Sequence, residues 1–172
     1  FELNKVKITI AVTFTTLAGY ILAKGRIDQD IILPVLGIFI LACGSAALNQ
    51  VQDSDKDAIM PRTSTRPIPS GQISTSIALL IGITEIIVGS LLIYYGSGFL
   101  ALQLGLLALI WYNGIYTPLK RKTAFAVIPG SIIGSIPPLV GWVSGGGSLL
   151  NPDAMVLALF FFISQVPHFW LL

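Results

Sequence analysis

Three oxygen-bearing side chains recur at every fourth position of one short stretch, NQVQDSDKD. They are Asn49, Asp53 and Asp57, which we call the acidic stripe. On an α-helix this spacing places them on one face, about 6 Å apart along the axis, with Asp55 on the other face. Carboxylate and amide oxygens suit Mg²⁺, which readily shares its remaining positions with phosphate oxygens. The spacing therefore predicts a magnesium site that also takes a phosphorylated substrate.

Two arginines follow the acidic stripe in the segment MPRTSTRPIPSG. The guanidinium groups of Arg62 and Arg66 can each bind phosphate oxygens through paired hydrogen bonds. Pro67 and Pro69 then end any helix. A charged connection between apolar segments is usually only solvated. The regular spacing of the acids, together with the paired arginines, favours a binding site instead.

The rest of the chain is strongly apolar. Of its 172 residues, 54% are hydrophobic and only 10% are charged, whereas about a quarter are charged in an ordinary soluble domain. The mean hydropathy is +0.84. The formal net charge of +2 is too small to suggest a nucleic-acid partner. The single cysteine, Cys43, excludes a disulfide framework within the chain and a cysteine metal cluster. These features predict an integral-membrane protein surrounded by a lipid bilayer.

The apolar residues fall into segments long enough to cross about 30 Å of hydrocarbon as helices. We therefore expect an all-α fold, a polytopic bundle of membrane helices in a single domain that covers residues 1–172. The expected spans are approximately 8–23, 31–48, 77–95, 99–116, 124–143 and 154–172.

Positive charge is distributed unequally between the two ends of these expected spans. When they are threaded in order, eight Lys and Arg residues fall on one side and two on the other. The positive-inside rule then places the N-terminus and the 49–76 and 117–123 loops in the cytoplasm, for a multi-pass protein of the cell inner membrane. The eight residues on the cytoplasmic side are Lys5, Lys7, Lys56, Arg62, Arg66, Lys120, Arg121 and Lys122.

Several motifs resemble one family of membrane enzymes. NQVQDSDKD is similar to the first aspartate-rich motif, Asn-x-x-x-Asp-x-x-x-Asp, of the UbiA-type intramembrane prenyltransferases. MPRTSTRPIPSG resembles the Arg-Thr-x-x-Arg-Pro run of the protohaem IX farnesyltransferase (haem O synthase) branch of that superfamily. Further segments match that branch in the same order: TFTTLAGYILA at 13–23, YTPLKRKT at 116–123, PGSIIGSIPPLVGW at 129–142 and QVPHFWLL at 165–172.

The resemblance implies a role for each matching residue. The acidic stripe would bind Mg²⁺ as cofactor and, through it, farnesyl diphosphate, while Arg62 and Arg66 would hold the diphosphate oxygens. Tyr116 and Lys120 match the Tyr-x-x-x-Lys pattern of the catalytic site, where the lysine would neutralise the departing diphosphate. His168, in the Pro-His-Phe-Trp motif, would lie near the haem b acceptor. On its residues alone, His168 fits an aromatic belt at the membrane interface better than a haem site.

The implied reaction joins a farnesyl group to a vinyl group of protohaem IX and yields haem O and diphosphate. Metal and fixed cations would stabilise the charge that develops on the diphosphate. The apolar bundle would shield the allylic cation from water. Haem is thus a substrate and not a prosthetic group. The oligomeric state is left open.

Family members carry a second aspartate-rich motif after their sixth helix, and this chain ends at Leu172. We therefore expect the N-terminal two thirds of a nine-helix enzyme, inactive without the remainder. Two alternatives stay open. One is a prenyltransferase that acts on an aromatic quinone precursor. The other is a transporter that uses Asp53, Asp57 and the intramembrane Glu85 as an ion path.

Overall fold

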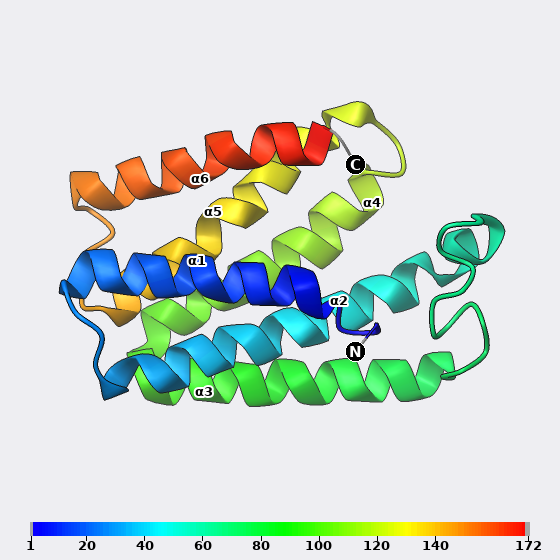
Figure 1. The fold of residues 1–172 in the computed structure, drawn as a ribbon, viewed down its shortest axis with the longest axis horizontal. Helices are drawn as coiled ribbons and strands as arrows, with labels where there is room; N and C mark the ends of the chain where they lie inside the picture. The colour runs from blue at the N-terminus through cyan, green and yellow to red at the C-terminus, as the bar shows by residue number, and fades with distance from the viewer. Residues whose placement is uncertain (1, 171–172) are drawn as a thin grey trace.

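All regular secondary structure in the described part of the chain is helical. The computed structural model describes residues 2–170, and the side chains of residues 2–167 (Figure 1). No β-strand occurs within residues 2–170, so the all-α prediction is confirmed. The elements in chain order are α1 Val6–Lys24, η1 Gln29–Ile31, α2 Ile32–Ile59, α3 Thr75–Ile110, η2 Trp111–Tyr116, α4 Thr117–Leu119, η3 Ala124–Ala126, α5 Val127–Ser144 and α6 Pro152–Trp170.

Helix α3 reverses direction at one glycine. Gly98 has φ 80° and ψ −171°, outside the helical region, and this is a conformation that glycine adopts without steric cost. Figure 1 shows the two legs of α3 running in opposite directions from this point. The ranges 77–95 and 99–116 expected from the sequence lie on these two legs, and the second leg continues through the π-helical turn η2.

Helix α2 is longer than the apolar run that predicted it. The expected membrane span ends at Leu48, and the helix continues past it to Ile59, as the four-residue spacing of the acidic stripe requires. Met60 is extended, with φ −90° and ψ 125°, as expected for a residue that precedes a proline, here Pro61. The first eleven residues of the expected 49–76 loop are therefore helical, and they carry the whole acidic stripe.

Glycines allow the backbones of α1 and α5 to approach closely. A Cβ atom at Gly141 would lie 1.8 Å from the backbone oxygen of Thr16, and one at Gly19 would lie 1.9 Å from that of Pro138. Contacts of this kind between small residues hold membrane helices together. The main core joins α2, α3 and α5 through Ile38, Leu41, Ile93, Ala101, Ile136 and Val140.

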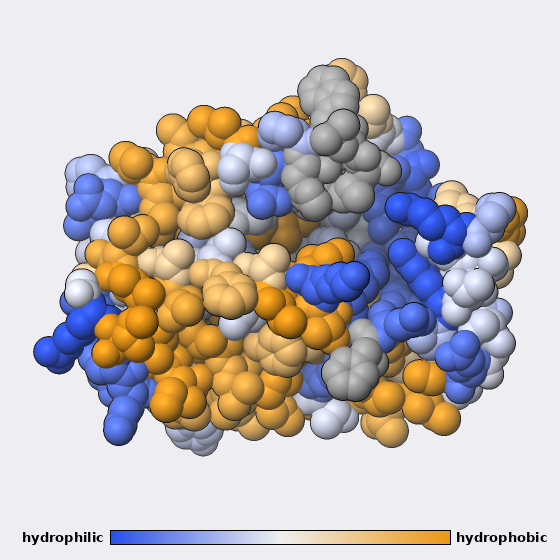
Figure 2. All heavy atoms as spheres, in the orientation of Figure 1, coloured by the Kyte–Doolittle hydropathy of each residue, from blue (hydrophilic) through white to orange (hydrophobic). Residues whose placement is uncertain are grey.

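The connections gather at two ends of the bundle (Figure 1). The segment before α1, the 60–74 loop and the 117–123 segment share one end, while the turn at Gly98 and the two remaining connections lie at the other. On the face drawn in Figure 2, apolar residues cover most of the surface between the two ends. Four helical stretches of the described chain are long and apolar enough to cross a membrane: Val6–Lys24, Gln29–Ile59, Thr75–Leu119 and Ala124–Ser144. The protein is therefore a multi-pass membrane protein.

Candidate functional site

The acidic stripe faces the interior of the bundle at the end where the 60–74 and 117–123 segments meet. Asn49 is fully buried, and Asp53 and Asp57 are only 7% and 6% exposed. Asp55, between them, is exposed. The predicted helical spacing thus places the three oxygen-bearing side chains together on the inner face of α2.

Asp53 is held by two neighbouring cations from the segment after α4. Lys120 Nζ lies 2.6 Å from Asp53 Oδ2, and Arg121 Nη2 lies 2.6 Å from Asp53 Oδ1. Arg121 Nε donates to the same Oδ1 at 3.2 Å. Arg121 also donates to the backbone oxygen of Gln52 at 2.6 Å. Sequence reasoning assigned a role only to Lys120. Arg121 was missed, although its position beside Lys120 was a signal for it.

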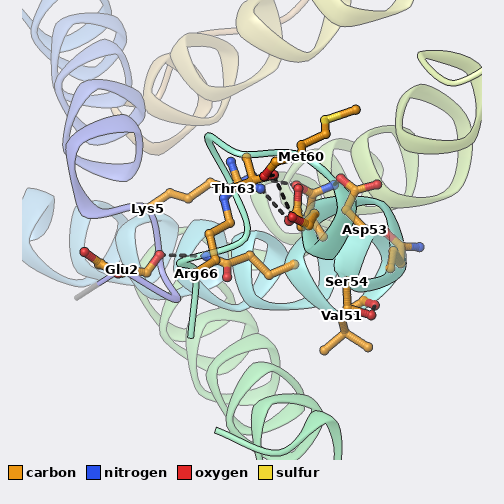
Figure 3. A network of polar contacts seen from close by, with 12 residues as sticks. Glu2, Lys5, Val51, Asp53, Ser54, Met60, Thr63 and Arg66 are labelled. Atoms are coloured by element: carbon orange, nitrogen blue, oxygen red, sulfur yellow. Dashed lines mark hydrogen bonds and ion pairs between the residues drawn. The ribbon is translucent and has the colours of Figure 1, made fainter. Parts of the chain in front are cut away.

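Asp57 is held by the loop that follows its own helix. Arg66 Nη1 lies 2.6 Å from Asp57 Oδ2, and the buried Thr63 hydroxyl donates to the Asp57 backbone oxygen at 3.0 Å. Figure 3 shows Arg66 and Thr63 from this loop close to the end of α2. Arg62 is exposed and contacts no polar partner among the described residues. Its predicted role in binding diphosphate stays a prediction.

Asn49 is the centre of a hydrogen-bonded network. Its Oδ1 accepts from Lys5 Nζ at 2.6 Å and from the Tyr112 hydroxyl at 3.2 Å. Its amide nitrogen donates to Asp53 Oδ2 at 3.1 Å and to Thr117 Oγ1 at 3.0 Å. These bonds fix the orientation of the amide. Lys5 and Tyr112 were not among the predicted site residues, because they lie 44 and 63 positions away from Asn49 in the sequence.

Lys5 reaches the site from a tightly bound segment before α1 (Figure 3). Its φ of 46° is unusual for a residue other than glycine. Gln50 helps to fix this segment by donating to the backbone oxygen of Leu3 at 3.0 Å. Burial, followed by the positive charges of Arg66 and Lys120, lowers the pKa of Lys5 to about 8. Lys5 is thus an additional cation within an already positive cluster.

The predicted pair Tyr116 and Lys120 comes together at the same end. Lys120 Nζ lies 5.8 Å from the centroid of the Tyr116 ring, within the range of a cation–π contact. The Tyr116 ring also stacks on Tyr112, with centroids 5.7 Å apart. Both tyrosines belong to η2, and π-helical turns of this kind often occur at functional sites.

An apolar cavity of about 130 Å³ adjoins this polar cluster. Lys5 and Tyr112 belong to both, and they form the polar end of the cavity. Its remaining walls come from α1, α2, the second leg of α3 and α5. They consist of Ile8, Thr9, Val12, Ile38, Leu41, Ala42, Ser45, Ala46, Gly105, Ala108, Leu109, Ile133 and Pro137.

Two other residues were predicted from the sequence to have a role, Glu85 and His168. Glu85 lies apart from the polar cluster. Glu85 accepts a hydrogen bond from Asn4 Nδ2 through Oε1, and Oε2 is buried without a partner among the described residues. It makes no contact with the acidic stripe. The side chain of His168 lies outside the described residues, so its predicted place near haem stays a prediction.

The side-chain oxygen atoms of the acidic stripe are of the type that Mg²⁺ prefers, but each carboxylate already contacts a cation of the chain. No three His, Cys, Asp or Glu side chains of the described part come together as a ready metal site. The two carboxylates are instead outnumbered by four cations, which leaves surplus positive charge. These residues therefore fit Mg²⁺ that arrives together with an anionic ligand such as a diphosphate. The four cations are Lys5, Arg66, Lys120 and Arg121.

Comparison with known proteins agrees with the resemblance seen in the motifs. Residues 12–172 match the UbiA prenyltransferase family. The chain belongs to this family. Within it, the chain is 36% identical over 170 residues to a protoheme IX farnesyltransferase of Oleidesulfovibrio alaskensis, covering 99% of this chain and 60% of that protein. It is 39% identical over 165 residues to the enzyme of the same name from Nitratidesulfovibrio vulgaris, covering 96% and 58%.

A third UbiA-family relative, the protoheme IX farnesyltransferase of Geobacter sulfurreducens, is 41% identical over 154 residues, covering 90% of this chain and 57% of its own. A solved structure from work on digeranylgeranylglyceryl phosphate synthase in membranes matches with a TM-score of 0.80 and 21% identity, covering 98% of this chain and 58% of that one. That likeness shows the fold of the helix bundle. The chain spans about 60% of the length of the curated relatives it matches.

Proposed function

We propose that the complete protein transfers a farnesyl group from farnesyl diphosphate to a vinyl group of protohaem IX, forming haem O and diphosphate. The names of the curated relatives support this reaction. The observation that carries it is the junction of the two parts of the site: a cluster with surplus positive charge opens onto an apolar cavity. A molecule with a diphosphate head and an isoprenoid tail matches both parts at once.

The cations of the site would act on the leaving group. The bond between C1 of the farnesyl chain and the diphosphate oxygen breaks, and its electron pair leaves with the oxygen. Lys120, Arg121 and Lys5 lie where they would stabilise the charge that develops there, because their contacts with the acidic stripe already hold them in place. Mg²⁺, when bound to Asp53 and Asp57, would supply further positive charge at the same oxygens.

Binding would require an exchange of partners. Lys120 and Arg66 are each 2.6 Å from a carboxylate of the acidic stripe. When those carboxylates turn to a metal ion, both cations become available to phosphate oxygens. The site would therefore bind metal and diphosphate together more tightly than it binds either alone.

The acceptor completes the reaction. The vinyl group of protohaem IX attacks the allylic cation through its terminal carbon, and water adds to the cation that results, with loss of a proton. The product carries a hydroxyethylfarnesyl side chain. The walls of the cavity are almost entirely apolar side chains and would keep water from the allylic cation before the vinyl group reaches it. We place His168 near the haem on the family motif.

We place this site on the cytoplasmic face of the inner membrane. Eight of the ten Lys and Arg residues of the chain lie at or before the start of α1, near the end of α2, in the 60–74 loop or in the 117–123 segment, at the end of the bundle that carries the site. Membrane proteins retain Lys and Arg on the cytoplasmic side. A transporter is less well supported, because Glu85, the one charged residue near the middle of a described helix, pairs with Asn4 and not with the site.

The test uses the full-length protein in membranes with farnesyl diphosphate and one of two acceptors. We expect haem b to be converted to a product with the mass of haem O, and a phenolic quinone precursor to remain unchanged. The 172-residue chain alone should give no product. Prenylation of the phenol with haem b untouched would instead assign the protein to quinone synthesis. Absence of both products would refute the proposal.

A further inference from the structure

The residues that line the apolar cavity extend along α2, away from the acidic stripe. Its lining residues on this helix recur once per turn, at Ser45, Leu41 and Ile38. Ile38 precedes Asn49 by eleven residues, which corresponds to about 16 Å along a helix. The end at Ile38 is therefore the part of the cavity farthest from the charged cluster.

Two other helices line the cavity in the same polar-to-apolar order. On α1 and the residue before it, the lining runs from Lys5 through Thr9 to Val12. On the second leg of α3 it runs from Tyr112 back to Gly105. Since the polar groups share one end, a ligand with a charged head and an apolar tail has a single favourable orientation, with its tail towards Val12 and Gly105.

The lining at the far end belongs to a tightly packed group. Ile38 and Leu41 are each 4% exposed, and they belong to one core cluster with the fully buried Ile93. Gly105 lies against this group. A Cβ atom there would be 3.1 Å from Leu41 Cδ2 and 3.2 Å from Ile93 Cδ1. The absence of a side chain at 105 thus leaves room for Leu41, and because Gly105 itself lines the cavity, a larger residue there would reduce the space at this end.

We propose that Ile38, Leu41 and Gly105 form a floor that selects the length of the isoprenoid chain. This inference rests on the proposed function and adds the residues that determine its substrate specificity. The cavity volume of about 130 Å³ is close to the roughly 150 Å³ of an engineered cavity that admits benzene. An isoprene unit has five carbons, nearly as many as benzene, so a change in the wall of this cavity should alter the fit of about one unit of the chain. We expect the floor to distinguish isoprenoid chains that differ in length by one unit.

The test measures binding of geranyl, farnesyl and geranylgeranyl diphosphates, each with Mg²⁺, to the full-length protein. Leu41→Ala deepens the cavity, and we expect the affinity for geranylgeranyl relative to farnesyl diphosphate to rise at least about tenfold. Gly105→Ala makes it shallower and should raise the affinity for geranyl relative to farnesyl diphosphate by a similar factor. The ratio of prenylated haem products in a competition assay should shift in the same directions.

Two matched variants serve as controls. Leu36→Ala removes a leucine from the exposed face of the same helix, and Gly114→Ala adds a methyl group whose nearest neighbour, Ile110 Cγ2, is 3.9 Å away. Both should keep the preference of the unmodified protein. If Leu41→Ala does not fold, Ile38→Val enlarges the same end at a smaller cost in stability, with a smaller shift in the same direction.

The outcomes separate this inference from the function on which it rests. Unchanged affinity ratios in folded floor variants would overturn the floor, even if haem O forms normally. Shifted affinity ratios without any prenylated haem would support the assignment of the floor residues and refute protohaem IX as the acceptor. Binding of none of the three diphosphates by the unmodified protein would overturn both.

Discussion

Asp53 should contribute much more to stability than Asp55, although both are acidic residues of α2. Asp53 is 7% exposed and accepts hydrogen bonds from Lys120, Arg121 and Asn49. Asp53→Asn keeps the side-chain volume but removes the negative charge. Lys120 and Arg121 then repel each other without a counter-ion. Loss of one partner from a fully buried ion pair costs about 3–5 kcal/mol.

The expected magnitude here is smaller, because the two cations are partly in contact with solvent. The side chains of Lys120 and Arg121 are 29% and 30% exposed, so water screens part of their repulsion. We therefore expect Asp53→Asn to lower the free energy of unfolding by about 1–3 kcal/mol. Asp55→Asn removes the same charge from the exposed face and should change it by no more than about 0.5 kcal/mol.

The assay is equilibrium unfolding of the full-length protein in detergent micelles, followed by circular dichroism. A chelator removes divalent metal, so that only the ion pairs within the chain are measured. Equal stability losses in Asp53→Asn and Asp55→Asn would show that the ion pairs of Asp53 contribute nothing measurable, and the reasoning would be refuted.

Two further predictions concern helix packing and pH. A methyl group at position 141 would lie 1.8 Å from a backbone oxygen of α1, so Gly141→Ala should lower the free energy of unfolding by about 1–3 kcal/mol. The control Gly114→Ala should lower it by less than about 0.5 kcal/mol. Equal thermal stability of the two variants would contradict this packing. At the opposite end of the bundle, hydrogen bonds from Lys24 and Tyr20 lower the pKa of Asp28 to about 2 from 3.8. Because its folded-state pKa lies below its unfolded-state value, Asp28 stabilises the fold above pH 4 and loses this contribution as the pH falls to about 2. Unfolding curves of the unmodified protein and Asp28→Asn should therefore converge over this interval, and a constant difference would show that Asp28 has no such role.

The part of the site that could be predicted from the sequence is the part set by local helical geometry. Asn49, Asp53 and Asp57 are four residues apart, so their shared face follows from the helix repeat wherever the helix packs. Tyr116 and Lys120 have the same spacing, and the structure brings them together as well. In both cases residues that lie close together in the sequence carry all the information that the prediction needs.

The missed residues depend on contacts between elements distant in the sequence. Lys5 reaches Asn49 because the segment before α1 packs against α2, and Arg121 reaches Asp53 across 68 positions. No periodicity within one segment encodes either contact. The extension of α2 beyond Leu48 follows from the spacing of the acidic stripe and not from hydropathy. The apolar run ends there, but the polar residues that follow face a polar interior formed by other helices.

The most direct test of the central claim is the binding of farnesyl diphosphate to the full-length protein, measured by titration calorimetry with Mg²⁺ or with a chelator. The claim is that the acidic stripe and the cations around it form a joint site for metal and diphosphate. We expect tight binding only with Mg²⁺, at least about tenfold weaker binding in folded Asp57→Asn, and unchanged binding in Asp55→Asn. Equal affinity in all three proteins, with or without Mg²⁺, would contradict the assignment of this site.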